Sequence, residues 1–247
     1  MQYVTVFAHR GASGYAPENT MSAFLLAKRL GADGVELDVH LTADGKVVVC
    51  HDSKVDRTTN GTGVIEEMTY EQLLGLDFGY PDAFGKRFEG ERISTLEEVF
   101  DAMLPAGLIV NVELKTTSDG IVEKVLAIEE KYKKCGLVLY SSFRLDYLKE
   151  LKRLSPDAKL APLYWTDDDF VNTGLTHGAV ALHPAFTCVT EGEDYCKKAH
   201  DAGLRVHPYT PNKAEDLEQL MLLGVDAVIT NYPDRAIDIR TKLLRRM

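Results

Sequence analysis

Three carboxylates in this chain have the residue type and spacing of a divalent cation site. Glu36 and Asp38 are two residues apart in an apolar, β-branched run, so in a strand both side chains leave the same face. Glu113, in a later run, brings a third acidic group to the same edge. Like charges so close repel unless a cation or a proton relieves them. Hard oxygen donors favour Mg²⁺ or Ca²⁺ over Zn²⁺, so the three residues predict a Mg²⁺ or Ca²⁺ site. The alternative is separate salt bridges with Lys and Arg.

Two histidines have the positions of an acid and base pair. His9 and His51 each follow an apolar β-run and each precedes a charged residue. A single histidine at a strand end is more often structural, but imidazole titrates near neutral pH, and two at one edge can exchange protons with a substrate. We expect His9 and His51 to be catalytic. His183 and His207 also lie near strand ends and are weaker candidates for contact with substrate.

Two cations lie beside the predicted carboxylate site. Arg10 directly follows His9, and Lys115 is two residues beyond Glu113. A guanidinium fork and a compact ammonium can hold the oxygens of a phosphoryl group, so we expect both to bind a substrate phosphate. The alternative is that they neutralise the acidic cluster directly. Both roles are compatible if substrate and metal replace the charge pairs.

Three further residues are candidates for orienting groups or lining a pocket. The segment Pro-Glu-Asn-Thr at 17–20 is typical of a helix start, with Asn19 as the expected N-cap and Glu18 as a residue that orients a neighbour. Phe143 and Tyr209 end the predicted fourth and seventh strands, where they can wall a pocket. Core packing is the usual role of any single aromatic residue.

The elements that must position these residues alternate along the chain. Short β-branched runs are each followed by a segment with helical apolar spacing, which is typical of βαβ units. No GxGxxG follows the first run, and eight strand and helix pairs in 247 residues favour an α/β fold of the (β/α)₈ TIM barrel type over an open doubly wound sheet. Active sites of such barrels lie at the carboxyl ends of the strands. The eight runs are residues 4–8, 34–38, 108–114, 137–142, 160–164, 179–183, 204–209 and 227–230.

One interval is more than twice as long as the others. Between the second and third runs, residues 41–49 have the pattern of a hairpin with an Asp-Gly turn, residues 56–63 form a Gly- and Thr-rich loop, and residues 70–76 have helical spacing. We interpret residues 52–92 as a small insertion over one barrel mouth after strand 2. The whole chain, 1–247, is then a single barrel domain.

The composition of the chain excludes some classes of binding partner. The chain has 28 Lys and Arg against 38 Asp and Glu, a net charge of −10, which argues against nucleic-acid binding. No uncharged apolar stretch approaches the ~18 residues of a membrane helix, and there is no basic leader, so no integral membrane association is expected. The four cysteines form no CxxC pair, which favours a reducing compartment. We expect a cytoplasmic protein with a small-molecule substrate; oligomeric state is not encoded in any visible pattern.

The motifs, taken in order, resemble those of the glycerophosphodiester phosphodiesterase family. The resemblance extends over the length of the chain. It is carried by His-Arg-Gly at 9–11, Pro-Glu-Asn-Thr at 17–20, Glu-Leu-Asp-Val at 36–39, Val-Cys-His-Asp at 49–52, Glu-Leu-Lys at 113–115, Ser-Phe at 142–143 and the segment 226–233.

The resemblance implies a fold, an activity and a set of roles. It implies a (β/α)₈ barrel and hydrolysis of deacylated phospholipids, such as glycerophosphocholine, to glycerol 3-phosphate and an alcohol. It also implies that Glu36, Asp38 and Glu113 bind Mg²⁺ or Ca²⁺, that His9 and His51 act as acid and base, and that Arg10 and Lys115 bind the phosphate.

The chain departs from the family pattern at two places. Tyr209 stands where the family commonly has Trp, which bears on the shape of the pocket and hence on the leaving group. Asn231 stands where Asp is common, so one acceptor is kept and a charge is lost.

Two other functions remain open at this level. A lysophospholipase D-type phosphodiesterase would need an apolar groove, which the polar loop at 56–63 does not favour but the aromatic residues in 70–84 leave open. A non-catalytic barrel that binds a phosphorylated metabolite would be favoured by loss of a catalytic position, and none is missing.

Overall fold

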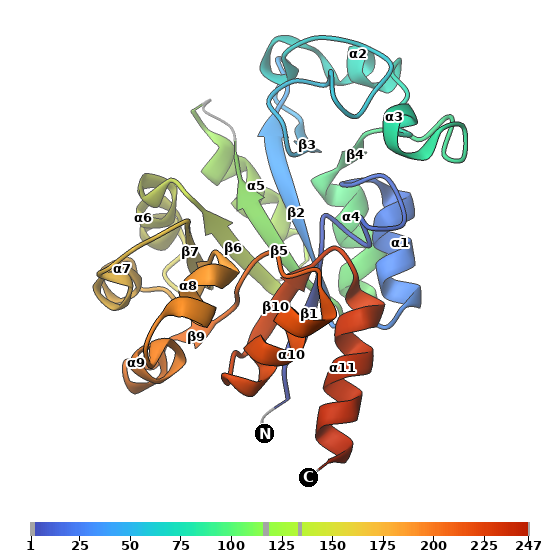
Figure 1. The fold of residues 1–247 in the computed structure, drawn as a ribbon. Helices are drawn as coiled ribbons and strands as arrows, with labels where there is room; N and C mark the ends of the chain where they lie inside the picture. The colour runs from blue at the N-terminus through green and yellow to red at the C-terminus, as the bar shows by residue number, and fades with distance from the viewer. Residues whose placement is uncertain (1–2, 116–118, 133–134, 247) are drawn as a thin grey trace.

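The barrel is built from eight parallel strands. The computed structural model describes residues 3–115, 119–132 and 135–246 (Figure 1). Neighbouring strands follow the order β10-β1-β2-β5-β6-β7-β8-β9, all in parallel. The strands are β1 Thr5–His9, β2 Gly34–Leu41, β5 Ile109–Leu114, β6 Val138–Ser142, β7 Leu160–Tyr164, β8 Ala181–Pro184, β9 Arg205–Val206 and β10 Ala227–Thr230.

The sheet closes on itself between β9 and β10. Tyr209 forms a parallel bridge with Ile229, and the backbone N–H of Ile229 donates to the carbonyl of Pro208 at 3.0 Å. The predicted TIM barrel is therefore confirmed. The run at 204–209 gives a regular strand only over Arg205–Val206, because Pro208 has no N–H to donate to a ladder.

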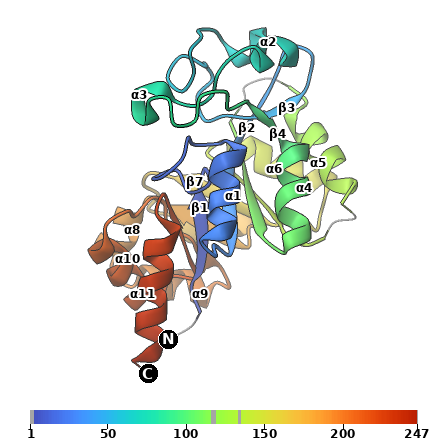
Figure 2. The same cartoon turned by 90° about the vertical axis from the view of Figure 1, so that its right-hand side faces the viewer.

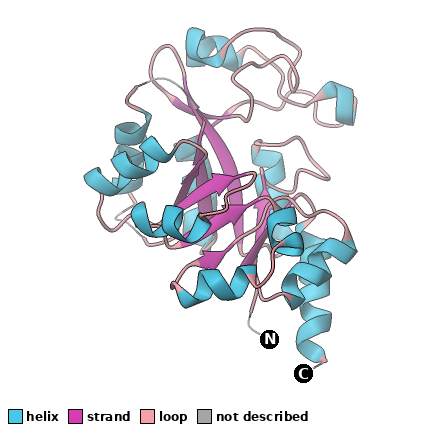
Figure 3. Ribbon diagram, turned by 60° about the vertical axis from the view of Figure 1, so that its left-hand side comes forward, coloured by secondary structure: helices cyan, strands magenta, loops and turns pink. Residues whose placement is uncertain are grey.

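Helices surround the strands (Figure 3). The helical apolar spacing in the sequence predicts helices at 19–30, 96–104, 120–134, 145–154, 191–202, 214–223 and 233–246. Seven observed helices coincide with these segments: α1 Met21–Arg29, α4 Leu96–Met103, α5 Ile121–Glu130, α6 Leu145–Leu154, α9 Tyr195–Asp201, α10 Ala214–Leu222 and α11 Pro233–Arg245. The segment before the fourth strand was expected to stay helical to Lys134, which lies outside the described residues. Two helices were not predicted, α7 Phe170–Thr176 and α8 Phe186–Glu191, because both are too short to show a clear apolar period.

The start of α1 corrects one expectation. The N-cap is Thr20, whose hydroxyl accepts a hydrogen bond from the N–H of Ala23. Asn19 was expected in that role but has a left-handed backbone, with φ of 59°, and its side chain turns toward the barrel instead. A left-handed residue lacks the extended conformation that an N-cap requires.

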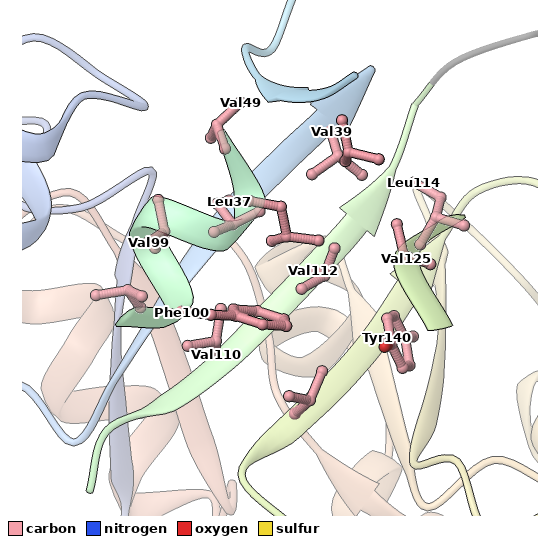
Figure 4. Close-up of a cluster of buried hydrophobic side chains, with 14 of the residues drawn as sticks. Leu37, Val39, Val49, Val99, Phe100, Val110, Val112, Leu114, Val125 and Tyr140 are labelled. Atoms are coloured by element: carbon pink, nitrogen blue, oxygen red, sulfur yellow. The ribbon is translucent and has the colours of Figure 1, made fainter. Parts of the chain in front are cut away.

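The main apolar core lies between the strands and the helices. Leu37 of β2, Val112 of β5 and Phe100 of α4 are fully buried in it (Figure 4). Because side chains alternate along a strand, burying Leu37 on the outer face aims Glu36 and Asp38 at the inside of the barrel. The packing of the helices thus sets the direction of the acidic side chains.

The segment after β2 lies at the carboxyl end of that strand (Figures 1 and 2). β3, Val47–Val49, pairs antiparallel with β2, so the predicted hairpin is present, and β4, Ser94–Thr95, pairs with β3. Between β3 and β4 lie three short helices: η1 Ile65–Glu67, α2 Tyr70–Leu74 and α3 Pro81–Phe84. A further short helix, η2 Leu104–Ala106, follows α4.

The same segment has an apolar cluster of its own, which includes Val55, Ile65, Leu73 and Phe78. This cluster gives the long loop a fixed shape. Among the helices of the described residues, none has the length and hydropathy needed to cross a membrane.

Candidate active site

The three predicted carboxylates meet inside the barrel at the carboxyl ends of β2 and β5. Asp38 is the register partner of Glu113 across the two strands, and Glu36 is two residues before Asp38. One carboxylate oxygen from each of the three lies within 4.8 Å of the others, and all three side chains are buried. The sequence spacing and the strand register together create this cluster.

Mutual repulsion makes the cluster a candidate cation site. Burial, followed by the charges of Asp38 and Glu113, raises the pKa of Glu36 well above its ordinary value. Burial and then Asp38 raise the pKa of Glu113 to about 8. Burial also raises the pKa of Asp38, but Arg10 and Lys115 outweigh it and hold that pKa below its usual range. A cation placed among the three groups would therefore favour the ionised forms of Glu36 and Glu113.

The two predicted phosphate-binding cations contact the acidic cluster. Lys115 Nζ lies 2.8 Å from Glu113 Oε1 and 3.5 Å from Asp38 Oδ1. Arg10 Nε lies 3.4 Å from Asp38 Oδ2, and the backbone N–H of Arg10 donates to Glu36 at 3.0 Å. Both side chains are partly exposed to the cavity, so they can also reach an anion there.

Asn19 adds a neutral contact to the same carboxylate. Its Nδ2 donates to Asp38 Oδ2 at 2.8 Å, and its Oδ1 accepts from the backbone N–H of Asp38 at 3.3 Å. The left-handed backbone that removes Asn19 from the helix cap therefore fixes the Asp38 side chain.

Asn231, which follows β10, holds His9 at the end of β1. Its Nδ1 donates to Asn231 Oδ1 at 2.7 Å, which leaves Nε2 free to accept a proton, 3.9 Å from Glu36 Oε2. Burial, and then the charge of Arg10, lower the pKa of His9 to about 4. His9 is therefore neutral at physiological pH.

His51 follows β3 and is oriented by its neighbour. Its Nδ1 donates to Asp52 Oδ1 at 2.6 Å, so Nε2 is again the nitrogen that can exchange a proton. Burial lowers the pKa of His51, and the charge of Asp38 acts in the opposite direction. A hydrogen bond from Arg57 lowers the pKa of Asp52 to about 2, so Asp52 is ionised at neutral pH.

Glu18 joins the two loops that carry the histidines. Arg10 Nη1 donates to Glu18 Oε1 at 2.9 Å, and Arg57 donates to both Glu18 oxygens at 2.7 and 2.9 Å. Arg57 also donates to both oxygens of Asp52, at 2.7 and 3.2 Å. Glu18 therefore lies where it can orient Arg10, as the sequence predicts. The pKa of Glu18 is lowered because the two arginines outweigh the effect of its burial.

A cavity of about 400 Å³ opens beside these groups. Asp38 and Glu18 lie behind its surface, and His207 lines a different cavity at the opposite end of the strands. The weaker candidate His183 does line the cavity. The other predicted site residues on its wall are His9, Arg10, Glu36, His51, Glu113, Lys115, Phe143 and Tyr209.

One wall of the cavity is aromatic. Phe143 stacks on Trp165 with ring centroids 5.6 Å apart, and Tyr209 meets Trp165 edge to face at 5.7 Å. Trp165 is 69% exposed, so this wall continues to the protein surface. Phe143 and Tyr209 thus line the cavity wall, as the sequence predicts.

Several site residues were not predicted. Trp165 follows the last residue of β7 directly, and that strand-end position was the signal that could have found it. Arg57 was assigned only to a polar loop, and no local pattern shows that its guanidinium reaches Glu18 and Asp52. Asn19 was assigned to the helix cap.

Comparison with known proteins agrees with this geometry. The model of the glycerophosphoryl diester phosphodiesterase family matches residues 9–235. The chain belongs to this family. Membership also makes it an enzyme, a phosphoric diester hydrolase, so the alternative of a non-catalytic barrel is wrong.

Individual family members match along most of their length. A glycerophosphodiester phosphodiesterase of Caldanaerobacter subterraneus subsp. tengcongensis is 40% identical over 96% of this chain and 98% of its own. One from Bacillus subtilis is 34% identical over 94% of this chain and 84% of its own.

Solved structures of family members share the fold. A glycerophosphoryl diester phosphodiesterase of Silicibacter pomeroyi, described as putative, has a TM-score of 0.88 at 27% identity, over 97% of this chain and 94% of its own. An Oleispira antarctica phosphodiesterase, solved in complex with the product sn-glycerol-3-phosphate, has a TM-score of 0.85 at 31% identity, over 95% of this chain and 96% of its own.

Proposed function

We propose that this enzyme hydrolyses deacylated phospholipids, such as glycerophosphocholine, to glycerol 3-phosphate and an alcohol with the help of Mg²⁺ or Ca²⁺. The observation that carries the proposal is the buried cluster of Glu36, Asp38 and Glu113, flanked by two cations and two imidazoles on one cavity. The product bound to the Oleispira antarctica relative supports the same substrate class.

The donor set fits a hard divalent cation. Glu36, Asp38 and Glu113 supply oxygen atoms alone, and the raised pKa values of Glu36 and Glu113 mean that these groups ionise fully only beside positive charge. A metal bound here would supply Lewis-acid stabilisation of charge on the phosphoryl oxygens.

Arg10 and Lys115 hold the phosphate in this mechanism. A phosphodiester is anionic and repels nucleophiles, so its non-bridging oxygens must be neutralised before attack. The two side chains lie on the cavity wall and contact the same carboxylates that would ligate the metal. A metal held by Glu36, Asp38 and Glu113 would leave the Lys115 ammonium and the Arg10 guanidinium available to the phosphate oxygens.

His9 and His51 transfer the protons. One Nε2 takes a proton from the nucleophile, either water or the neighbouring glycerol hydroxyl. The other imidazole enters the step protonated on Nε2 and gives that proton to the leaving alkoxide, and both return to their starting states by proton exchange with water. If the glycerol hydroxyl attacks, a cyclic phosphate forms first and water opens it. Glu18 orients Arg10, and Phe143 and Tyr209 form the wall against which the leaving alcohol lies.

The domain and compartment assignments belong to the same proposal. Residues 1–247 form one barrel domain, and residues 52–92 are an insertion that serves its active site through Arg57. The four cysteines are unpaired, which supports a cytoplasmic location. Cell fractionation with an antibody to the chain tests the location.

The test is hydrolysis by chelator-stripped enzyme. Purified protein is incubated with glycerophosphocholine or glycerophosphoethanolamine, with and without Mg²⁺ or Ca²⁺, and glycerol 3-phosphate is measured by a coupled assay. We expect release only with metal, and a fall in kcat of ~10²–10⁴-fold in His9→Ala and His51→Ala. Near wild-type turnover in either variant contradicts the acid and base assignment.

A lysophospholipase D activity is the second candidate, because the aromatic wall at Phe143 and Trp165 continues into an adjoining pocket of about 330 Å³. Parallel assays with long-chain lysophosphatidylcholine separate the two. A higher kcat/KM for the lysolipid than for glycerophosphocholine selects the second candidate.

A further inference from the structure

The floor of the active-site cavity carries three buried polar atoms that lack partners among the described residues. They are Asn111 Oδ1, Ser141 Oγ and His183 Nδ1, and their residues are 1%, 0% and 0% exposed. An unsatisfied buried polar group costs about 1–3 kcal/mol. All three residues line the same cavity, so a bound molecule can satisfy them there.

The strand register places two of these residues beside the acidic cluster. Asn111 of β5 is the register partner of Glu36, and Ser141 of β6 is the register partner of Glu113. Neighbouring strands are about 4.8 Å apart, so the floor begins one strand spacing from the carboxylates. A substituent of a phosphate held at those carboxylates is therefore within reach of it.

The chemistry of the floor matches hydroxyl groups. An amide oxygen accepts, a serine hydroxyl donates and accepts, and a neutral imidazole nitrogen does either, according to tautomer. Burial holds the pKa of His183 well below its ordinary value, so the floor is uncharged. The aromatic wall at Phe143, Leu163 and Trp165 instead presents apolar carbon to the cavity.

We propose that Asn111, Ser141 and His183 form a subsite for the free hydroxyls of the glycerol arm, while the other alcohol lies along the aromatic wall. This rests on the proposed function. The hydroxyls of a glycerol arm give each of the three floor atoms a hydrogen-bond partner. The subsite therefore determines that glycerol is the alcohol that keeps the phosphate. An arm without hydroxyls leaves the three floor atoms unsatisfied.

The experiment compares two ligands that differ only in the diol. Titration calorimetry measures binding of sn-glycerol 3-phosphate and of propyl phosphate to the wild-type enzyme and to Ser141→Ala and Asn111→Leu, in the presence of Mg²⁺ or Ca²⁺. We expect the wild type to prefer glycerol 3-phosphate by at least ~10-fold, and each variant to lose most of that preference, because each lost hydrogen bond is about 1 kcal/mol or more.

Ser142→Ala is the matched control. Its hydroxyl is one residue along β6 and donates to the carbonyl of Leu114 at 2.9 Å, so the same substitution removes a satisfied hydrogen bond. We expect this variant to keep the wild-type ratio of the two affinities. Thermal unfolding of each variant shows whether it is folded before titration.

Three results overturn the subsite: equal affinity of the wild type for both ligands, an unchanged ratio in folded Ser141→Ala, or a fall in metal affinity in Asn111→Leu that accounts for its whole effect. The third result makes Asn111 a metal ligand. Failure of the proposed function is separate, because it is seen as absent hydrolysis of glycerophosphodiesters by the wild type, whatever the binding ratio.

Discussion

His9 and Asn231 meet where β1 lies beside β10, although 222 residues separate them. The neutral amide orients the imidazole without adding charge, so burial and Arg10 keep the pKa of His9 low. An Asp at this position would stabilise the protonated imidazole more strongly. The hydrogen bond to Asn231 also favours the protonated form, but burial and Arg10 outweigh it, so His9 stays neutral.

Asn231→Asp tests this account. A carboxylate in place of the amide raises the pKa of His9, because it favours the charged imidazole. The limb of the pH profile of kcat/KM that belongs to His9 moves to higher pH: the acid limb if His9 is the base, the alkaline limb if it is the acid. A profile in which neither limb moves contradicts the proposed role of His9.

Glu36→Gln tests the metal site at the same scale. The amide keeps an acceptor for the N–H of Arg10 but removes a carboxyl group whose ionised form Asp38 and Glu113 repel. Without metal, the variant is expected to be at least as stable as wild type. Added Mg²⁺ or Ca²⁺ should raise the midpoint temperature of thermal unfolding of the wild type but not that of the variant. An equal rise in both means that Glu36 does not bind the metal.

At the scale of elements, Arg57 links the insertion, which includes Asp52, to the loop before α1. It lies in the insertion, and its guanidinium contacts Glu18 from the loop before α1 and Asp52 from the end of β3. A planar fork fits two carboxylates at once, which an ammonium cannot reproduce. Arg57 is therefore a positioning residue for His51 and Arg10.

Arg57→Gln is expected to lower kcat ~10-fold or more, with Arg57→Lys intermediate, because misplaced catalytic groups reduce turnover. Arg87→Gln is the control, since Arg87 is in the same insertion but lies over the Phe88 ring. Steady-state kinetics on glycerophosphocholine give kcat and KM separately. An equal loss in the control variant would assign the effect to the insertion as a whole.

At the scale of the whole molecule, the barrel interior holds two histidines in contact. His183 Nε2 and His207 Nδ1 are 3.2 Å apart, and both side chains are buried. Burial lowers the pKa of His207 to about 4 and that of His183 further, with His207 adding to the effect on His183. The folded state thus excludes protons that the unfolded chain binds.

The contribution of this histidine pair to stability should therefore fall with acidification, whereas the raised pKa values of Glu36 and Glu113 contribute in the opposite direction. Above the ordinary histidine pKa of 6.5 both states are neutral, and as the pH falls from about 6.5 to about 4 the unfolded state alone takes up protons. For His207 the loss amounts to about 3 kcal/mol. Urea unfolding of the wild type and of His207→Gln at pH 7.5, 6 and 5 measures this contribution as the difference between the two proteins. By pH 5 the free energy of unfolding of the wild type should have fallen by ~2 kcal/mol relative to that of the variant. A difference that is the same at all three pH values contradicts the account.

The sequence by itself determined the barrel and the principal chemistry, because both follow local rules. Alternation along a strand puts Glu36 and Asp38 on one face, and the ends of parallel strands meet at one edge, which brings in His9 and Glu113. Departures were small: the strand at 204–209 is cut short by Pro208.

Only the tertiary structure decided which side chains form hydrogen bonds with the residues of the site. Asn231 reaches His9 only because the barrel closes, and Arg57 reaches Glu18 only because the insertion folds back over β1. Asn19 contacts Asp38 through a left-handed backbone that its sequence context does not reveal. Such contacts join residues far apart in the chain, and periodicity carries no information about them.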